Sequence, residues 1–552
     1  MDRDANHHTH RLGNEMRRPP RSAIVLVLVL IVVAMVALAG FSFSELMLTE
    51  NKATHVHGDS LRLEQAIGSG VEFLQLFCEQ PPQVRAAAGG SFDNPNLFRA
   101  VPLSPDERST NQATHQLCFS VVSPLVEDAQ STRVRFGVED ESGRLHLADV
   151  LRWDQQQPGD GRKALMKLPG MTEPVADAIL DWVDPDSTPR GTGAENEYYT
   201  GLEQPYSPRN ALPESIEELL LVKGVTRELL FGPDANYNHQ IEPYELNGPQ
   251  NSAPRASRST AITPWASLLT LYSGWRNLNS EGGPRIDLNA VDLMKLHQQL
   301  SVALDARWAS FIVALRRYGL YAGNDPGTSD SPPVDNSVPA RFVFGSALDL
   351  IGARVAIPGA TSSQPPKVVA SPISNDSQGM GQELSRLLDK TTTINLPVVR
   401  GGVSLNHASV AVLSAVPGID DALAGRIVAA CQGQGPQNSL ARRFPTWLLS
   451  EGVADLTQMK TLMPNVCAEG DVVRAEVIGH FTPTGQSARV EVVIDATTIP
   501  ARQVAWKDLR LFGPAYPQEW FSDGASTNDY DPRDRGRKRT GSSRPASSRG
   551  TH

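Results

Sequence analysis

The sequence predicts an α+β protein in which one N-terminal membrane helix precedes a small antiparallel sheet that carries a large helical insertion. Three observations predict this fold. An uncharged apolar run lies near the N-terminus, strand-like alternation occurs both before residue 142 and after residue 468, and related helical segments lie between them. At 552 residues, the chain is too long for one hydrophobic core, so several modules are expected.

The first element is a transmembrane helix over residues 22–43. The run from Ala23 to Phe43 carries no charge, and about 20 residues at about 1.5 Å each cross a hydrocarbon core of about 30 Å. Arginines precede the run and glutamates follow it. The positive-inside rule therefore places the leader, residues 1–21, in the cytoplasm and the rest of the chain outside. A cleaved signal peptide is the alternative, but its apolar region is normally shorter.

Residues 44–142 hold the continuation of this helix and the first strands. Helical patterning persists past the membrane, so a nearly continuous helix from Ala23 to Phe77 is expected. A Pro-, Asn- and Ser-rich loop is expected at residues 81–112. Apolar and polar residues then alternate at Leu117–Val126 and Arg133–Asp140, which predicts two strands.

The middle of the chain repeats one plan, in which a Gly-led turn and a polar helix start lead into a helical hairpin. The copies are expected at residues 143–232, 283–322 and 401–467, and they open with GRLHLAD, GPRIDLNA and GVSLNHA. Asn289 and Asn406 are placed to cap the helices that follow, since Asn is a favoured N-cap residue.

The remaining segments are a linker-rich region, a second strand region and a tail. Residues 323–400 contain Pro-, Ser- and Gly-rich stretches typical of linkers, notably Gly323–Pro339 and Gly359–Gly381. Alternation returns in residues 468–516 and predicts strands that complete the sheet. The Arg- and Ser-rich residues 517–552 are expected to be disordered. The predicted later strands are Val472–Phe481, Ala488–Ile494 and Gln503–Leu511.

Two turns, centred on Gly170 and Gly418, match the helix-hairpin-helix form of SAM-like domains. Gly suits such a turn because it adopts positive φ without strain. In DNA-binding versions the turn amides hold a phosphate beside Lys or Arg. Here acidic residues such as Glu173 and Asp421 follow the turns, and the formal net charge is -10. Packing or partner binding is therefore favoured over nucleic-acid binding.

The sharpest chemical signal lies in residues 233–250, where Asp234 to Glu245 has the register of an EF-hand calcium loop. The position that is usually Gly holds His239, which costs about 1–2 kcal/mol and predicts a modest affinity. Calcium is expected here, and a polar turn is the alternative. The expected ligands are Asp234, Asn236, Asn238, Gln240 through its carbonyl, Glu242 and Glu245.

A second acidic loop is a candidate for another cation. Asp184, Asp186 and Glu195 follow one another closely, and Asp181 precedes them. Carboxylates are the ligands that calcium prefers. In the alternative interpretation, these side chains cap helices or pair with Arg190, and the sequence leaves both open.

Catalytic signatures such as GxSxG, HExxH and the phosphate loop are absent from the sequence, so an enzyme is not expected. The cysteines, Cys78, Cys118, Cys431 and Cys467, show no CxxC spacing, which disfavours a zinc site. Four cysteines could form two disulfides, or all four could remain free thiols, and the sequence leaves both open.

The order of these parts resembles the minor pseudopilin of type II secretion known as the general secretion pathway protein K family. The resemblance rests on the anchor, on the three openings, on IEELLLVKGVT and on the block from Ala176 to Tyr199 (ADAILDWVDPDSTPRGTGAENEYY). The apolar run is similar to a pilin helix. It departs from pilins at Arg21-Ser22-Ala23, where pilin leaders usually end in Gly.

The resemblance implies a bulky subunit at the tip of a short periplasmic pseudopilus, which initiates and caps assembly during protein secretion. It implies a single-pass protein of the inner membrane, with residues 22–43 in lipid and the bulk of the chain in the periplasm. The implied partners are other minor pseudopilins, the inner-membrane platform of the secretion machinery and prepilin peptidase. It also implies calcium that braces loops of the ectodomain.

Two alternatives to this interpretation stay open. One is a membrane-anchored, extracytoplasmic helix-hairpin-helix protein that binds DNA. The other is a calcium-dependent surface interaction protein that is unrelated to pili.

Overall fold

The computed structural model describes residues 21–103, 116–124, 134–237, 245, 263–328, 338–359, 364–373, 377–432, 440–482 and 485–521. The chain divides into two compact units, Met1–Arg62 and Leu63–His552. The tail expected to be disordered lies almost wholly outside the described residues.

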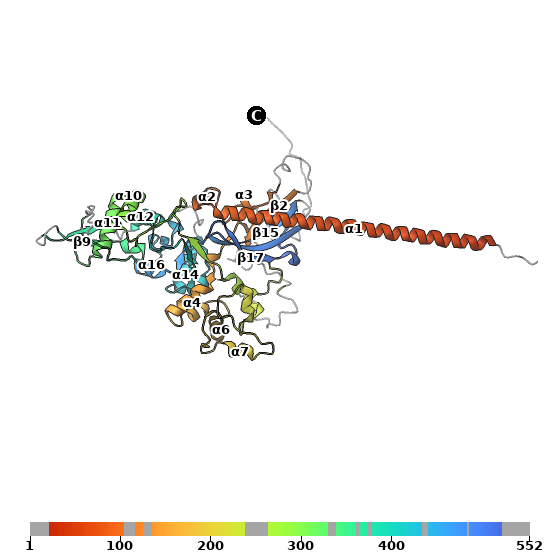
Figure 1. Cartoon of the computed structure of the whole chain (residues 1–552), viewed down its shortest axis with the longest axis horizontal. Helices are drawn as coiled ribbons and strands as arrows, with labels where there is room; N and C mark the ends of the chain where they lie inside the picture. The colour runs from red at the N-terminus through yellow and green to blue at the C-terminus, as the bar shows by residue number, and fades with distance from the viewer. Residues whose placement is uncertain are drawn as a thin grey trace, which may run out of the picture. The chain divides into compact units, whose positions relative to one another are not determined.

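One long helix, α1 (Arg21–Glu79), provides the described part of the first unit and enters the second (Figure 1). By length and composition, it is the one helix among the described residues that is suited to cross a membrane. The apolar side chains from Val25 onward are exposed, as expected for a lipid-facing segment. The prediction of a nearly continuous helix is confirmed, and α1 runs through its glycines without a break.

The second unit is built on an antiparallel sheet in the order β1-β2-β15-β16-β17, with β3 beside β2 and β4 beside β15. Val121 of β2 lies opposite Val477 of β15, although the two are far apart in the sequence. The strands on either side of the helical block thus form one sheet, as predicted (Figure 1). The strands are β1 (Val101–Pro102), β2 (Gln116–Pro124), β3 (Val134–Phe136), β4 (Glu139–Asp140), β15 (Val472–Thr482), β16 (Ser487–Asp495) and β17 (Arg502–Asp508).

The end of α1 packs closely on this sheet within the second unit. Ile67, Val71 and Leu74 of α1 are buried in one core with Val477. A Cβ atom at Gly70 would lie 2.7 Å from Cγ1 of Val477, so the absence of a side chain lets the helix approach the strand. Apolar burial of this kind stabilises the fold by about 25 cal/mol per Å².

The prediction of a loop at residues 81–112 is partly wrong. Its described residues contain the short helices α2 (Pro82–Ala87) and α3 (Pro95–Phe98) and the strand β1. Proline occupies the start of both helices, where its fixed φ and missing N–H suit the first turn. Phe98 is fully buried and packs edge-on against Phe77, with ring centroids 5.4 Å apart.

The insertion between β4 and β15 is mainly helical. Its first part contains η2 (Glu141–Gly143), β5 (Leu145–His146), α4 (Leu147–Gln156), α5 (Asp160–Leu165), α6 (Glu173–Val183), α7 (Asn196–Thr200), η3 (Ile216–Leu221), α8 (Arg227–Phe231), η5 (Trp265–Ser267), β6 (Leu269–Thr270) and β7 (Gly274–Arg276). Its second contains β8 (Ile286–Asp287), α10 (Leu293–Ala303), α11 (Ala306–Tyr318), η6 (Ala347–Leu350), β9 (Arg354–Ile357), β10 (Lys367–Ala370), α12 (Ser377–Lys390) and β11 (Thr391–Thr392).

Its third part contains β12 (Val398–Arg400), β13 (Val403–Ser404), α13 (Val410–Ala415), α14 (Asp421–Gln432), η7 (Leu440–Arg443), α15 (Trp447–Ser450), α16 (Leu456–Leu462) and β14 (Val466–Cys467). The short helices η8 (Arg510–Phe512) and η9 (Gln518–Phe521) follow the sheet.

Three openings of the insertion share one local structure. In each, a two-residue strand forms a parallel pair with a distant strand, namely β5 with β6, β8 with β11 and β13 with β14. The leucine after each strand, Leu147, Leu288 or Leu405, is buried. The three openings therefore share a local structure, while the helical hairpin expected in each copy stays a prediction.

The prediction that Asn289 and Asn406 cap helices is wrong. Asp292 and Ser409 cap α10 and α13 instead, since their side chains accept bonds from the first amides of those helices. The Asn289 amide group bonds the backbone of Phe344, and Asn406 donates to the carbonyl of Arg442. Both asparagines thus join segments of the insertion.

The turns at Gly170 and Gly418 have φ values of 73° and 92°, the positive region that favours glycine. Lys167, beside the first turn, forms an ion pair of 2.9 Å with Asp421, beside the second. The two turns therefore lie close to each other, while their assignment to the helix-hairpin-helix form stays a prediction.

The second expected linker, Gly359–Gly381, differs from the prediction. It contains β10, which pairs with β9, and the first turns of α12. Val369 of β10 is buried, but such a short apolar pair is hard to detect inside a Pro- and Ser-rich stretch. Among the described residues, none of the four cysteines forms a disulfide with another.

Candidate cation sites

The acidic loop begins at the end of α6, whose residues from Val175 to Val183 are all buried. Asp181 faces inward from this helix and accepts hydrogen bonds from the amides of Arg190 (3.2 Å) and Ala194 (2.8 Å). A Cβ atom at Gly193 would lie 1.9 Å from the Asp181 carboxylate, so only glycine fits there. Asp181 thus holds the loop against the helix.

Arg190 neutralises part of the negative charge of this loop. It pairs with Asp154 at 3.0 Å and with Asp181 at 2.9 Å, and it also contacts Oδ2 of Asp184. The interpretation in which these carboxylates pair with Arg190 is therefore correct for Asp181 and for one oxygen of Asp184.

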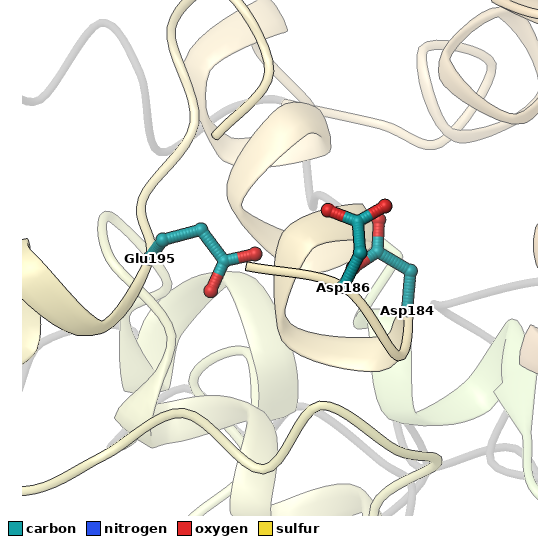
Figure 2. A group of neighbouring side chains, drawn as sticks. All are labelled: Asp184, Asp186 and Glu195. Atoms are coloured by element: carbon teal, nitrogen blue, oxygen red, sulfur yellow. The ribbon is translucent and has the colours of Figure 1, made fainter. Parts of the chain in front are cut away.

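Three carboxylates gather beyond this arginine. Asp184, Asp186 and Glu195 each offer one oxygen, and these oxygens all lie within 4.8 Å of one another. Figure 2 shows Glu195 on one side of the loop with its carboxylate directed toward Asp184 and Asp186. The sequence predicted these residues as a second cation site, and the fold brings them together.

The buried oxygens of this group lack partners. Neither oxygen of Glu195 nor Oδ1 of Asp184 accepts a hydrogen bond from any described residue. Glu195 is 5% exposed, whereas Asp186 is exposed and accepts a bond from the amide of Thr188. A buried carboxylate without a partner is costly, and a bound cation removes that cost.

The pKa values in this loop reflect the same crowding. Burial, together with the charges of Asp181, Asp184 and Asp186, raises the pKa of Glu195 to about 7. Burial also raises the pKa of Asp184, against the lowering effect of Arg190. A set of hard oxygen donors on a crowded loop fits calcium, which takes about six to eight oxygens.

The EF-hand-like loop is described only in part. Asn238, Gln240 and Glu242 lie outside the described residues. The Oε1 atom of Glu245 accepts bonds from the amides of Ala235 (2.8 Å) and Asn236 (3.4 Å), so Glu245 lies against the start of the loop. The two ends of the predicted loop therefore meet, while calcium binding there stays a prediction.

Arg489 supports this loop and was not predicted. It lies on β16, is almost fully buried, and donates to the carbonyls of Tyr237 (2.9 Å) and Asn236. It also pairs with Glu476 on β15 at 3.0 Å. The predicted strand Ala488–Ile494 also contains the charged Glu491, so no local signal singled out Arg489.

The fold and the loop define a class of protein. It is an α+β protein whose long apolar N-terminal helix continues onto an antiparallel sheet, and whose helical insertion carries an acidic loop suited to a cation. Residues 143–231 match the family model described as type II secretion system (T2SS), protein K. They include the acidic loop, so this part of the chain is similar to the family that the sequence resembles.

Two curated relatives carry the same name, Type II secretion system protein K. The protein of Pectobacterium carotovorum subsp. carotovorum is 26% identical over 221 residues, or 39% of this chain and 61% of that protein. The protein of Pseudomonas aeruginosa is 34% identical over 106 residues, or 18% of this chain and 31% of that protein. The matches thus span less than two thirds of either relative.

A solved structure is also similar. It is a chain of the GspK-GspI-GspJ complex from the type 2 secretion system of enterotoxigenic Escherichia coli. The TM-score is 0.29 at 10% sequence identity, and the match covers 83% of this chain and 99% of that one.

Proposed function

We propose that this chain is a minor pseudopilin-like structural subunit of type II secretion, which initiates and caps a pseudopilus at its tip. The observation that supports this most is the family match over residues 143–231. The exposed apolar length of α1 supports it independently, because a pilin-like subunit enters a filament through such a helix.

In this proposal, α1 anchors the chain in the inner membrane as a single span, with its N-terminus in the cytoplasm and the second unit in the periplasm. The partners are other minor pseudopilins, which pack against α1 and the sheet, and the inner-membrane platform. The helical insertion supplies bulk that stops further subunits from adding above it. This work is mechanical and needs no catalytic group.

Calcium is proposed as a brace for the loops of the insertion. Asp184, Asp186 and Glu195 would hold one ion, and the loop from Asp234 to Glu245 would hold another. The ion would neutralise carboxylates that otherwise repel each other, and this would fix the loop against α6.

DNA binding is not favoured as an alternative. The two glycine turns lie beside acidic residues, and Lys167 next to the first turn is paired with Asp421 next to the second. A phosphate held by the turn amides would meet that carboxylate.

The mass of the N-terminal peptide of the protein extracted from its native membrane tests the proposal. Processing by prepilin peptidase predicts a new, methylated N-terminus between Arg21 and Ile24. An uncut N-terminus would instead indicate a plain membrane anchor and would oppose the pseudopilin assignment.

A further inference from the structure

The second opening of the insertion contains an arginine whose side chain lacks the carboxylate partner that its counterpart in the first opening has among the described residues. In the first opening, Arg144 precedes β5 and donates to Glu139 from both Nε (3.2 Å) and Nη2 (2.8 Å). Arg285 stands at the same place before β8, yet it forms no ion pair or side-chain hydrogen bond with any described residue, and its Nε atom is buried. Its guanidinium lies over the ring of Phe444, 5.6 Å from the centroid.

Arg285 lines a cavity of about 180 Å³ in which three further arginines converge from distant segments. Arg85 of α2 and Arg276 of β7 both pair with one carboxylate, Asp471, at 3.2 Å and 2.9 Å. Arg443, at the end of η7, forms no side-chain hydrogen bond or ion pair within the part of the chain that the structure describes.

The cavity is therefore positively charged. Among its described lining residues, the carboxylates are Asp471, which the two paired arginines share, and the exposed Glu469. Four arginines and two carboxylates leave a net charge of plus two. Burial lowers the pKa of Arg285, and the charge of Arg443 acts in the same direction, while Asp389 and Asp471 oppose it.

These features suit an anion with several acceptor oxygens. A guanidinium offers a planar fork of N–H donors that matches the oxygens of a carboxylate, phosphate or sulfate group. The forks of Arg285 and Arg443 are both available on the wall of one cavity. Its volume exceeds by several-fold the roughly 10–15 Å³ that one water molecule needs, so a polyatomic group fits.

We propose that this cavity binds a small oxyanion, a phosphate, sulfate or carboxylate group, between Arg285 and Arg443. In the first opening, the carboxylate of Glu139 pairs with Arg144. In the second opening, the bound anion takes the corresponding place beside Arg285. Bound there, it links the second repeat, through Arg285, to the third, through η7. This inference goes beyond the proposed function and does not depend on it.

Equilibrium dialysis of the detergent-solubilised full chain against radiolabelled inorganic phosphate, at constant ionic strength, tests the proposal. Saturable binding that sulfate or acetate displaces is expected, since the site recognises acceptor oxygens. Arg443→Gln should weaken this binding at least tenfold. Arg502→Gln, which removes an exposed arginine outside the cavity, should leave it unchanged.

Melting temperatures separate an anion site from a purely structural role. Without phosphate, Arg443→Gln should melt at the same temperature as the parent chain or higher, because it removes an unbalanced charge. Phosphate should raise the melting temperature of the parent and of Arg502→Gln, but not that of Arg443→Gln. The proposal is overturned if no oxyanion binds saturably, or if Arg443→Gln binds phosphate with the affinity of the parent.

Discussion

At the scale of single residues, two carboxyl groups of the acidic loop, those of Asp181 and Glu195, have different roles. Asp181 is saturated by Arg190 and by backbone amides, so it is a structural anchor of the loop. Glu195 is buried without a hydrogen-bond partner among the described residues, so it retains the capacity to bind a cation. The difference arises from position on the fold and not from residue type.

Replacing Glu195 by Gln should weaken calcium binding to this loop by at least about tenfold, the size typical for losing even a supporting group of a metal site. The loss follows because Gln keeps the shape but removes the charge. Calcium titration of the solubilised full chain by calorimetry measures it. Glu197→Gln is the matched control, since Glu197 is exposed two residues away. Equal affinity in Glu195→Gln and the parent would contradict the assignment.

The pH dependence of stability offers a second test. The pKa of Glu195 is about 7 in the folded chain, above its ordinary value of 4.5. Between these values the folded state binds a proton that the unfolded state releases, so calcium-free stability falls as pH rises from about 4.5 to about 7. Melting temperatures in a chelator at pH 5 and pH 8 should show this fall, and Glu195→Gln should reduce it. An identical fall in that variant would contradict the prediction.

Calcium should reverse this trend. The ion binds the ionised carboxylate and competes with its proton, so calcium affinity should rise as pH increases through about 7. The stabilisation by calcium, measured as the difference in melting temperature with and without the ion, should therefore be larger at pH 8 than at pH 5. A larger effect at pH 5 would contradict a role for Glu195 in calcium binding.

Sequence reasoning found the proposed calcium ligands more readily than the residues that support the loops. Asp184, Asp186 and Glu195 stand close together in the sequence, so their clustering was predictable. Arg489 and Arg285 were not recognised, because their surroundings come from segments that only the folded chain brings together. Local reasoning at Asn289 also failed, since a tertiary contact with Phe344 outweighs its capping preference.

At the scale of elements, periodicity predicted the long helix and the main strands well. The predicted strand Val472–Phe481 is β15 (Val472–Thr482), and Ala488–Ile494 lies within β16 (Ser487–Asp495). Short elements were missed, because strands such as β10 are shorter than the pattern needed to detect them. They form through pairing with distant segments, which a local pattern does not contain.

The contact between α1 and β15 allows a matched comparison on one helix. Gly70→Ala should lower the unfolding free energy of the second unit by about 1–3 kcal/mol, because its Cβ atom would lie 2.7 Å from Val477. Gly68→Ala should raise it by about 0.5–1 kcal/mol, since the added Cβ atom would meet no described atom within 4 Å apart from its chain neighbours and its own helix backbone. Thermal melting of the two variants measures the difference. Similar melting temperatures would contradict close packing of α1 on the sheet.

The link between the sheet and the EF-hand-like loop is also testable. Arg489→Met should destabilise the second unit by about 3–5 kcal/mol, because it leaves Glu476 without this ion pair in a buried site. It also releases the carbonyls of Asn236 and Tyr237. Chemical denaturation measures the effect, with Arg502→Met on β17 as the exposed control. A loss no greater than that of the control would contradict the role given to Arg489.

At the scale of the whole molecule, the chain joins two kinds of structure. A membrane-length helix leads into a sheet whose strands come from both ends of the second unit, and three openings of similar local structure lie in the insertion between them. The similarity to the protein K family over residues 143–231 was predictable because the block from Ala176 to Tyr199 carries specific residues. The cavity between the repeats was not, since it depends on their packing.

Co-purification of the tagged full chain from its native membrane, followed by mass spectrometry, tests the central claim most directly. The proposed function predicts that other minor pseudopilins are recovered with the chain. It also predicts that duplex DNA is not retained. Recovery of the chain alone, or of DNA that is released by salt, would contradict the assignment to a pseudopilus tip.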